Sequence, residues 1–339
     1  MNASNKPQEY APLLTATPIA TAQPLLGIAA QPAMVVMNRN PVQEHVVFNA
    51  TIEDYLAQSP GLLVREKLWL AQMLCGACEK QVQFKVANWD QHVPDAAEDS
   101  EFTARPAQFM IKEESECCQR YCFHQLRHLK LGVFPMGGTM HDTQERSGWP
   151  VGVDRLLEME KPCRCPIICG CCMFCKPEMT VTRPAQPQRG VPEEYFGRVE
   201  FDWKWWNCFF PCEQYMSVKD HEDRELYSLR RPVCCSLKDC ACVNMCAPSC
   251  CNLVHRTYIE QDQVVVGEMK NIFPGWNVRG MCQGNTAADN FALIYPQDAT
   301  VQGKSLLLAG LMLQNFVYWE TRSNQNQNQG GGGGFNNNY

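Results

Sequence analysis

Residues Ser305 to Trp319 read SLLLAGLMLQNFVYW, an apolar stretch bounded by Lys304 and Glu320. As a helix these residues rise about 22 Å, which is short of the roughly 30 Å hydrocarbon core of a bilayer. A helix that is apolar on nearly every side must be buried, and the interior of a β-barrel can enclose it. The stretch therefore favours a buried helix over a membrane-spanning one. The positions expected in this buried or membrane helix are Ser305, Leu306, Leu307, Leu308, Leu311, Met312, Leu313, Phe316, Val317 and Trp319.

Upstream of this stretch, many short segments alternate apolar and polar residues, as in Val82, Phe84 and Val86 or in Phe291, Leu293 and Tyr295. A period of two indicates strands with one face turned inward. Turn signals recur between these segments, among them Gly61 and residues 219–223, and no rhythm of long amphipathic helices intervenes. The pattern predicts a mainly β protein, either a barrel or a sandwich.

The ends of the chain differ in composition from its middle. Residues 1–50 are rich in Pro, Ala and Thr, and residues 323–339 are rich in Asn, Gln and Gly, so we expect two disordered arms around one domain at 51–322. The first ten residues lack the layout of a secretory signal, which predicts a cytosolic protein with reduced thiols. The formal net charge of -6 provides no broad basic field, so nucleic acid is an unlikely partner.

The chain contains 21 cysteines, and a dense cluster lies in KPCRCPIICGCCMFCKP, between Lys161 and Pro177. Thiols in an apolar segment with basic edges suit S-acylation, because each fatty chain adds about 0.8 kcal/mol per buried CH₂ and the cations favour an anionic leaflet. The predicted palmitoylation sites are Cys163, Cys165, Cys169, Cys171, Cys172 and Cys175. Other cysteines, such as Cys208, Cys212 and Cys282, read as small buried hydrophobic residues.

Zinc binding is an alternative role for the cysteines. A structural zinc site needs four converging thiolates or imidazoles, and C-x-x-C pairs supply two each. Two such pairs are present, Cys75 with Cys78 and Cys172 with Cys175. The adjacent cysteines elsewhere in the chain are poor chelators, so acylation is favoured over zinc.

Seven motifs, taken in order, resemble those of the phospholipid scramblase family and together span roughly residues 50 to 322. They are YLAQSPGLLVREKL (55–68), ESECCQRYC (114–122), EKPCRCPIICGCCMFC (160–175), PVCCSLKDCAC (232–242), VVVGEMKNIFPGW (264–276), TAADNFALIYPQD (286–298) and the segment ending FVYWET (316–321). The resemblance implies a tubby-like closed antiparallel barrel of about twelve strands around a C-terminal helix. It also implies palmitate on the cysteine cluster named above.

The calcium segment of the family falls on residues 287–298, where the resemblance implies Asp289, Asn290 and Asp298 as ligands. A calcium loop requires acidic residues at alternating early positions and a glycine at position six, whereas here position five is Phe291 and position six is Ala292. Only two carboxylates remain, and the apolar alternation is typical of a strand. The sequence therefore leaves two alternatives, a weak Ca²⁺ site or no site.

The resemblance implies ATP-independent, bidirectional movement of phospholipids between leaflets, promoted by calcium, at the cytoplasmic face of the plasma membrane. No nucleotide-binding P-loop and no hydrolase nucleophile motif is present in the sequence. The alternative is a palmitoylated, membrane-tethered adaptor that binds lipid without moving it. Expected partners are membrane phospholipids of an anionic leaflet, together with either further copies of the chain or signalling proteins. The aromatic run FDWKWWNCFF (201–210) suits either the headgroup level or the barrel core.

Overall fold

The computed structural model describes eleven parts of the chain: residues 51–67, 82–89, 105–114, 128–136, 155–162, 176–202, 213–232, 255–272 and 290–319, and two short strands. These strands are β1 (Val35–Val36) and β2 (Val46–Val47), which pair antiparallel with each other. They fall within the segment predicted to be a disordered arm, and residues 323–339 lie outside the described residues. The boundaries of the two arms stay a prediction.

Within the described residues, twelve strands form a closed antiparallel barrel in the order in which they occur along the chain, and β14 pairs with β3 to close it. This confirms the predicted fold class. The strands are β3 (Gly61–Glu66), β4 (Gln83–Asn88), β5 (Phe109–Glu113), β6 (Leu129–Pro135), β7 (Leu157–Lys161), β8 (Glu178–Arg183), β9 (Glu194–Asp202), β10 (Glu213–Asp220), β11 (Glu225–Pro232), β12 (His255–Gln261), β13 (Val264–Ile272) and β14 (Asn290–Ile294).

The core of the barrel consists of alternate side chains of the strands. In β5, Phe109 and Ile111 belong to the core, and in β7 the same holds for Leu157 and Met159, with less buried residues between them. Successive side chains of a strand point to opposite faces, so one set from each strand fills the interior. The period-two segments of the sequence are therefore the inward faces of barrel strands.

A short helix, α1 (Ile52–Leu56), precedes the first barrel strand. Thr51 begins it with a capping arrangement in which the Thr51 backbone N–H donates to the Asp54 carboxylate at 2.7 Å. Ile52 and Leu56 are buried in the barrel core. A second short helical turn, η4 (Pro187–Arg189), lies between β8 and β9.

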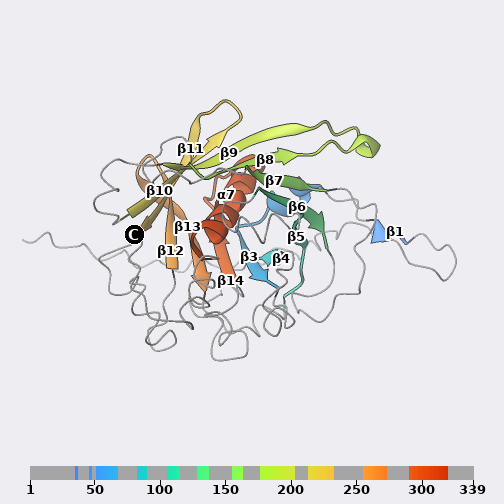
Figure 1. Cartoon of the computed structure of the whole chain (residues 1–339). Coiled ribbons are helices and arrows are strands. Elements are labelled where there is room, and N and C mark those ends of the chain that lie inside the picture. Colours follow the sequence, from blue (N-terminus) through green and yellow to red (C-terminus); the bar gives the residue numbers. More distant parts are fainter. Residues whose placement is uncertain are drawn as a thin grey trace, which may run out of the picture. The chain divides into compact units, whose positions relative to one another are not determined.

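The C-terminal helix α7 (Val301–Gln314) lies among the strands (Figure 1) and is followed by a π-helical turn, η6 (Asn315–Trp319). A Cβ atom placed on Gly310 would stand within 4 Å of Val199 of β9, Leu229 of β11 and Met269 of β13, so strands surround the helix. All residues of α7 from Gly303 to Gln314 are buried. The fold prediction of an enclosed C-terminal helix is confirmed.

The helix boundary and one predicted turn differ from the sequence-based expectation. The helix begins at Val301 instead of Ser305, because the Thr300 hydroxyl caps it by accepting the Gly303 N–H at 3.1 Å. Gly61 is the first residue of β3 and not part of a turn. A Cβ atom at Gly61 would stand 2.5 Å from the Leu293 carbonyl oxygen, so glycine permits β3 and β14 to approach closely there.

Candidate functional site

The barrel has two chemically different ends. Because all of its pairings are antiparallel, successive connections along the chain alternate between the ends. We call the end at which β3, β5, β7, β9, β11 and β13 finish the cysteine end. The opposite end is the α1 end, where α1 leads into β3 and where α7 begins.

All 21 cysteines belong to the six connections that leave and re-enter the barrel at the cysteine end. The strands, α7 and the connections at the α1 end contain none. The cysteines lie outside the described residues, but the strand ends that flank their connections are described. These connections are 67–82, 114–128, 162–177, 203–212, 233–254 and 273–289.

The interior of the barrel becomes polar as it approaches the cysteine end. Glu66, Glu113, Lys161, Arg231 and Asn271 follow apolar core residues on the inward faces of their strands, and each is at most 8% exposed. Buried charges are expensive unless they are paired. The four charged side chains are two carboxylates and two cations, and none of them is without a partner. This end of the interior is thus an ionic layer, in contrast to the apolar middle.

The end of α7 makes a buried polar contact with β12. The Thr257 hydroxyl of β12 donates to the Gln314 Oε1 atom at 2.8 Å, and both residues are buried. Two residues later, the rings of Phe316 and Phe84 lie edge to face with their centres 6.3 Å apart. Gln314, which interrupts the apolar run, therefore has a buried hydroxyl as its partner on β12.

Lys304 joins α7 to α1 at the other end of the barrel. Its ammonium group donates to the carbonyl oxygens of Leu56, Ala57 and Ser59 at 2.8, 3.1 and 2.9 Å, and lies 5.5 Å from the centre of the Tyr295 ring. Cations are favourable at the C-terminal end of a helix, where carbonyl groups lack partners. Burial lowers the pKa of Lys304. The contact fixes the first turn of α7 to the short helix.

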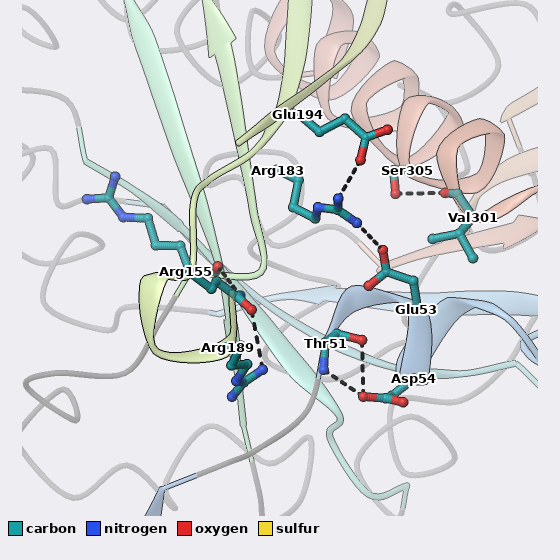
Figure 2. A network of polar contacts seen from close by, with 10 residues as sticks. Thr51, Glu53, Asp54, Arg155, Arg183, Arg189, Glu194, Val301 and Ser305 are labelled. Atoms are coloured by element: carbon teal, nitrogen blue, oxygen red, sulfur yellow. Dashed lines mark hydrogen bonds and ion pairs between the residues drawn. The ribbon is translucent and has the colours of Figure 1, made fainter. Parts of the chain in front are cut away.

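A network of charged residues covers the α1 end (Figure 2). Arg183 of β8 pairs with Glu53 of α1 and with Glu194 of β9, each at 2.5 Å. A cleft of about 330 Å³ lies beside it, lined by residues that include Ile52, Leu156 and Arg183. The two carboxylates neutralise the Arg183 guanidinium, so the network links α1 to β8 and β9. It does not by itself indicate a site for an anion.

Known proteins that are similar in sequence to this chain include two human phospholipid scramblases. Human phospholipid scramblase 1 is 24% identical over 274 residues, which cover 80% of this chain and 67% of that protein. Human phospholipid scramblase 2 is 23% identical over 268 residues, covering 79% and 70%. The chain is thus similar to phospholipid scramblases over about 80% of its length. The matched part spans about two thirds of the length of these relatives, and neither a family model nor a solved structure matches the chain.

Two of the three predicted calcium ligands are among the described residues. Asn290 is the first residue of β14 at the cysteine end, and Asp298 lies beyond the other end of that strand, in the connection to α7. A strand rises about 3.4 Å per residue, so the length of β14 separates Asn290 from Asp298. Two ligands of one calcium ion must each lie about 2.4 Å from it, which this separation does not permit. An ion held by Asp298 therefore takes its other ligands from elsewhere than Asn290. Asp289 lies outside the described residues, and calcium binding stays a prediction.

The remaining sequence-based sites are not resolved by the described part of the chain. The acylation cluster, Cys163 to Cys175, and the alternative zinc pair Cys75 and Cys78 lie outside it. Among the residues that are described, no group of three or more His, Cys, Asp and Glu side chains could hold a metal. None of the described helices combines the length and the apolar character needed to cross a membrane.

Proposed function

We propose that this protein is a phospholipid scramblase, which moves phospholipids in both directions between leaflets without ATP and responds to calcium. The observation that carries the proposal is the match over 80% of the chain to a protein named phospholipid scramblase 1. The candidate acylation sites support it, because all of them belong to one connection, 162–177, which links β7 and β8 at the cysteine end. The expected location is the cytoplasmic face of the plasma membrane.

In this proposal, fatty chains on Cys163, Cys165, Cys169, Cys171, Cys172 and Cys175 provide the contact with the bilayer. The apolar residues of α7 are enclosed in the barrel and are not free to insert. One acyl chain binds a membrane only marginally, whereas two or more anchor a protein stably. Intact-mass measurement before and after hydroxylamine tests this step. The expected result is the loss of at least two palmitoyl masses, and a mass unchanged by hydroxylamine would contradict it.

Transport is tested with purified full-length protein in liposomes that carry fluorescent phospholipid, quenched from outside with dithionite. Without ATP, calcium should reduce the protected fraction well below one half, since lipids of the inner leaflet become accessible. Protein-free liposomes are the control for leakage. Stable membrane binding with a protected fraction near one half would rule out scrambling under these conditions.

A matched pair of variants tests the calcium dependence separately. Asp298 and Asp262 are both exposed at the α1 end, but only Asp298 lies in the predicted calcium segment. We expect Asp298→Asn to raise the calcium concentration needed for half-maximal transport at least threefold, because calcium sites depend on carboxylate charge. Asp262→Asn should leave it unchanged. Equal calcium responses in the two variants would exclude Asp298 as a ligand without affecting the transport proposal.

The second candidate function is a palmitoylated adaptor that binds lipid without moving it. The enclosure of α7 favours it, because movement of a headgroup requires a polar path through the hydrocarbon. The liposome experiment distinguishes the two functions. The adaptor predicts binding with no lipid exchange at any calcium concentration, and calcium-dependent exchange by the purified protein would exclude it.

A further inference from the structure

The hairpin formed by β8 and β9 extends past the strands on either side of it (Figure 1). β7 pairs with β8 only as far as Thr182, and β10 pairs with β9 only as far as Gly197. The pairing between β8 and β9 continues beyond both positions, to Arg183 and Glu194. A ribbon of two strands is marginally stable by itself, so this part of the sheet opens locally more readily than strands with two neighbours.

A bulge in β9 determines which side chains of this ribbon face outward. Thr182 lies opposite Tyr195, and the register then shifts, so that Thr180 lies opposite Arg198. Thr180 and Thr182 alternate along β8 and share its outer face, so Tyr195 and Arg198 share that face too, although they are three residues apart. Phe196, the residue that follows Tyr195, belongs to the barrel core. The bulge therefore places the Tyr195 ring outside the barrel and beside Arg198.

Tyr195 is the one exposed aromatic side chain among the residues that the structure describes, with 40% of its surface accessible. Glu193 and Glu194 precede it and are exposed as well. Kinases distinguish their substrates partly by patterns of charge, and acidic residues before a tyrosine form such a pattern. The sequence and the exposure of Tyr195 together indicate a substrate for a tyrosine kinase.

Arg198 is positioned to neutralise negative charge on the Tyr195 side chain. Its guanidinium is within hydrogen-bonding reach of the Tyr195 hydroxyl, and Asp223 and Glu178 are the carboxylates nearby. Arg198 pairs with Asp223 at 3.1 Å and with Glu200 at 3.3 Å. The Asp223 side chain is 60% exposed, and pairs between exposed charges contribute little, whereas a guanidinium binds phosphate through two parallel hydrogen bonds. Arg198 can therefore exchange Asp223 for a phosphate on Tyr195.

We propose that Tyr195 is a phosphorylation site for a tyrosine kinase and that Arg198 holds the resulting phosphate. The Tyr195 oxygen attacks the γ-phosphorus of ATP, the bond between that phosphorus and ADP breaks, and the phenolic proton passes to the catalytic base of the kinase. The product carries a charge of about −1.5 to −2 at pH 7. Local opening of the ribbon presents the residues around Tyr195 to the kinase. This goes beyond the proposed lipid transport and does not depend on it.

The first test is phosphorylation of the folded, full-length protein with ATP and a purified cytosolic tyrosine kinase, followed by mass spectrometry of tryptic peptides. The kinase is chosen from a panel by its activity on the synthetic peptide GVPEEYFGR, which is the tryptic peptide Gly190–Arg198 and contains Tyr195 as its one tyrosine. The control is Tyr258, which is half-buried in a strand with two neighbours. We expect Tyr195 to be phosphorylated at least about tenfold faster than Tyr258, because its strand opens more readily.

Three results would overturn the proposal. They are a panel in which no kinase modifies the synthetic peptide, a folded protein that gains no phosphate on Gly190–Arg198, and a rate at Tyr195 no greater than the rate at Tyr258. Tyr195→Phe confirms the assignment, since it should abolish the modification of this peptide and leave any other phosphorylated peptide unchanged.

A matched pair of variants tests recognition through the acidic pattern. Glu193→Gln removes a carboxylate two residues before Tyr195, and Asp262→Asn removes one from the exposed turn between β12 and β13. We expect the first variant to lower the initial rate at Tyr195 by about threefold or more and the second to leave it unchanged. Equal rates in the two variants would contradict recognition by charge.

The phosphate contact of Arg198 is tested by phosphorus NMR of the modified protein during a pH titration. The second ionisation of a phosphotyrosine has a pKa of about 6. A neighbouring cation stabilises the dianion, so Arg198→Gln should raise the pKa of this phosphate by at least about half a unit, and Arg198→Lys should restore most of the difference. A purely structural role of Arg198 would not move this titration. The same phosphate pKa in Arg198→Gln and in the unaltered protein would refute the contact.

Discussion

The three hydrogen bonds from Lys304 to α1 make a sharp test of how α7 is held in the barrel. We consider Lys304→Met, which retains most of the aliphatic chain and removes the ammonium group. Lys304 is 6% exposed, so the carbonyl oxygens of Leu56, Ala57 and Ser59 lose a donor at a largely buried position. Each carbonyl left without a partner costs about 1–3 kcal/mol.

Two effects reduce the total cost. Removal of the ammonium group also removes the cost of burying its charge, and water can reach carbonyls at a barrel end. We therefore expect the free energy of unfolding to fall by about 3 kcal/mol. With a urea m-value of about 3 kcal/mol/M, appropriate for a protein of this size, the unfolding midpoint should fall by about 1 M.

The matched control is Lys219→Met, which removes an ammonium group from a strand surface. Lys219 pairs with Glu200 at 2.5 Å and is 23% exposed. Pairs of this type contribute at most about 1 kcal/mol, so its midpoint should fall by no more than about 0.3 M. Urea unfolding followed by tryptophan fluorescence and by circular dichroism measures both. Equal midpoints for the two variants would refute the view that Lys304 anchors α7.

Two further predictions concern the packing and the pH dependence of the barrel. Gly310→Leu places a Cβ atom 2.9 Å from the Leu229 Cδ1 atom and should lower the free energy of unfolding by about 2–3 kcal/mol. At Gly190 no atom lies within 4 Å of an added Cβ, but φ is +66°, so Gly190→Ala should lower it by only about 1 kcal/mol. Urea midpoints measure this, and a smaller loss in Gly310→Leu would contradict the packing. Burial and the hydrogen bond to Glu213 raise the pKa of Tyr215 to about 12, so its proton is held more tightly in the folded state. This contribution to stability is fully present below pH 10 and is lost as the pH rises from 10 to 12. Between pH 10 and pH 12 the thermal unfolding midpoint should therefore fall less steeply for Tyr215→Phe than for the unaltered protein. Parallel plots of midpoint against pH for the two proteins would refute the assignment.

Much of the barrel could be predicted from local sequence patterns. Alternating segments such as Phe291, Leu293 and Tyr295 report the inward face of a strand, because the strand period is a local property. The helix boundary was wrong by four residues, because the polar first turn around Lys304 carries no apolar signal. Its lysine is satisfied by α1, almost 250 residues away along the chain, and only the tertiary fold provides that partner.

The candidate site shows the same division. The order of the motifs led to the resemblance to phospholipid scramblases, and the cysteine cluster around Cys169 was visible as composition. The ionic layer was missed, although Leu62, Val64 and Glu66 already continue one inward face from apolar residues to a carboxylate. The period locates Glu66 on that face, but the oppositely charged Lys161 and Arg231 come from strands far away along the chain. Their common layer follows from closure of the barrel.

The sequence by itself determined the strand period, the apolar helix and the number of charges and thiols, because these depend on residue identity and near neighbours. Only the tertiary structure decided which connections share an end. Antiparallel pairing returns the chain to the same side with every second connection, and this rule gathers cysteines from Cys75 to Cys282 at one end.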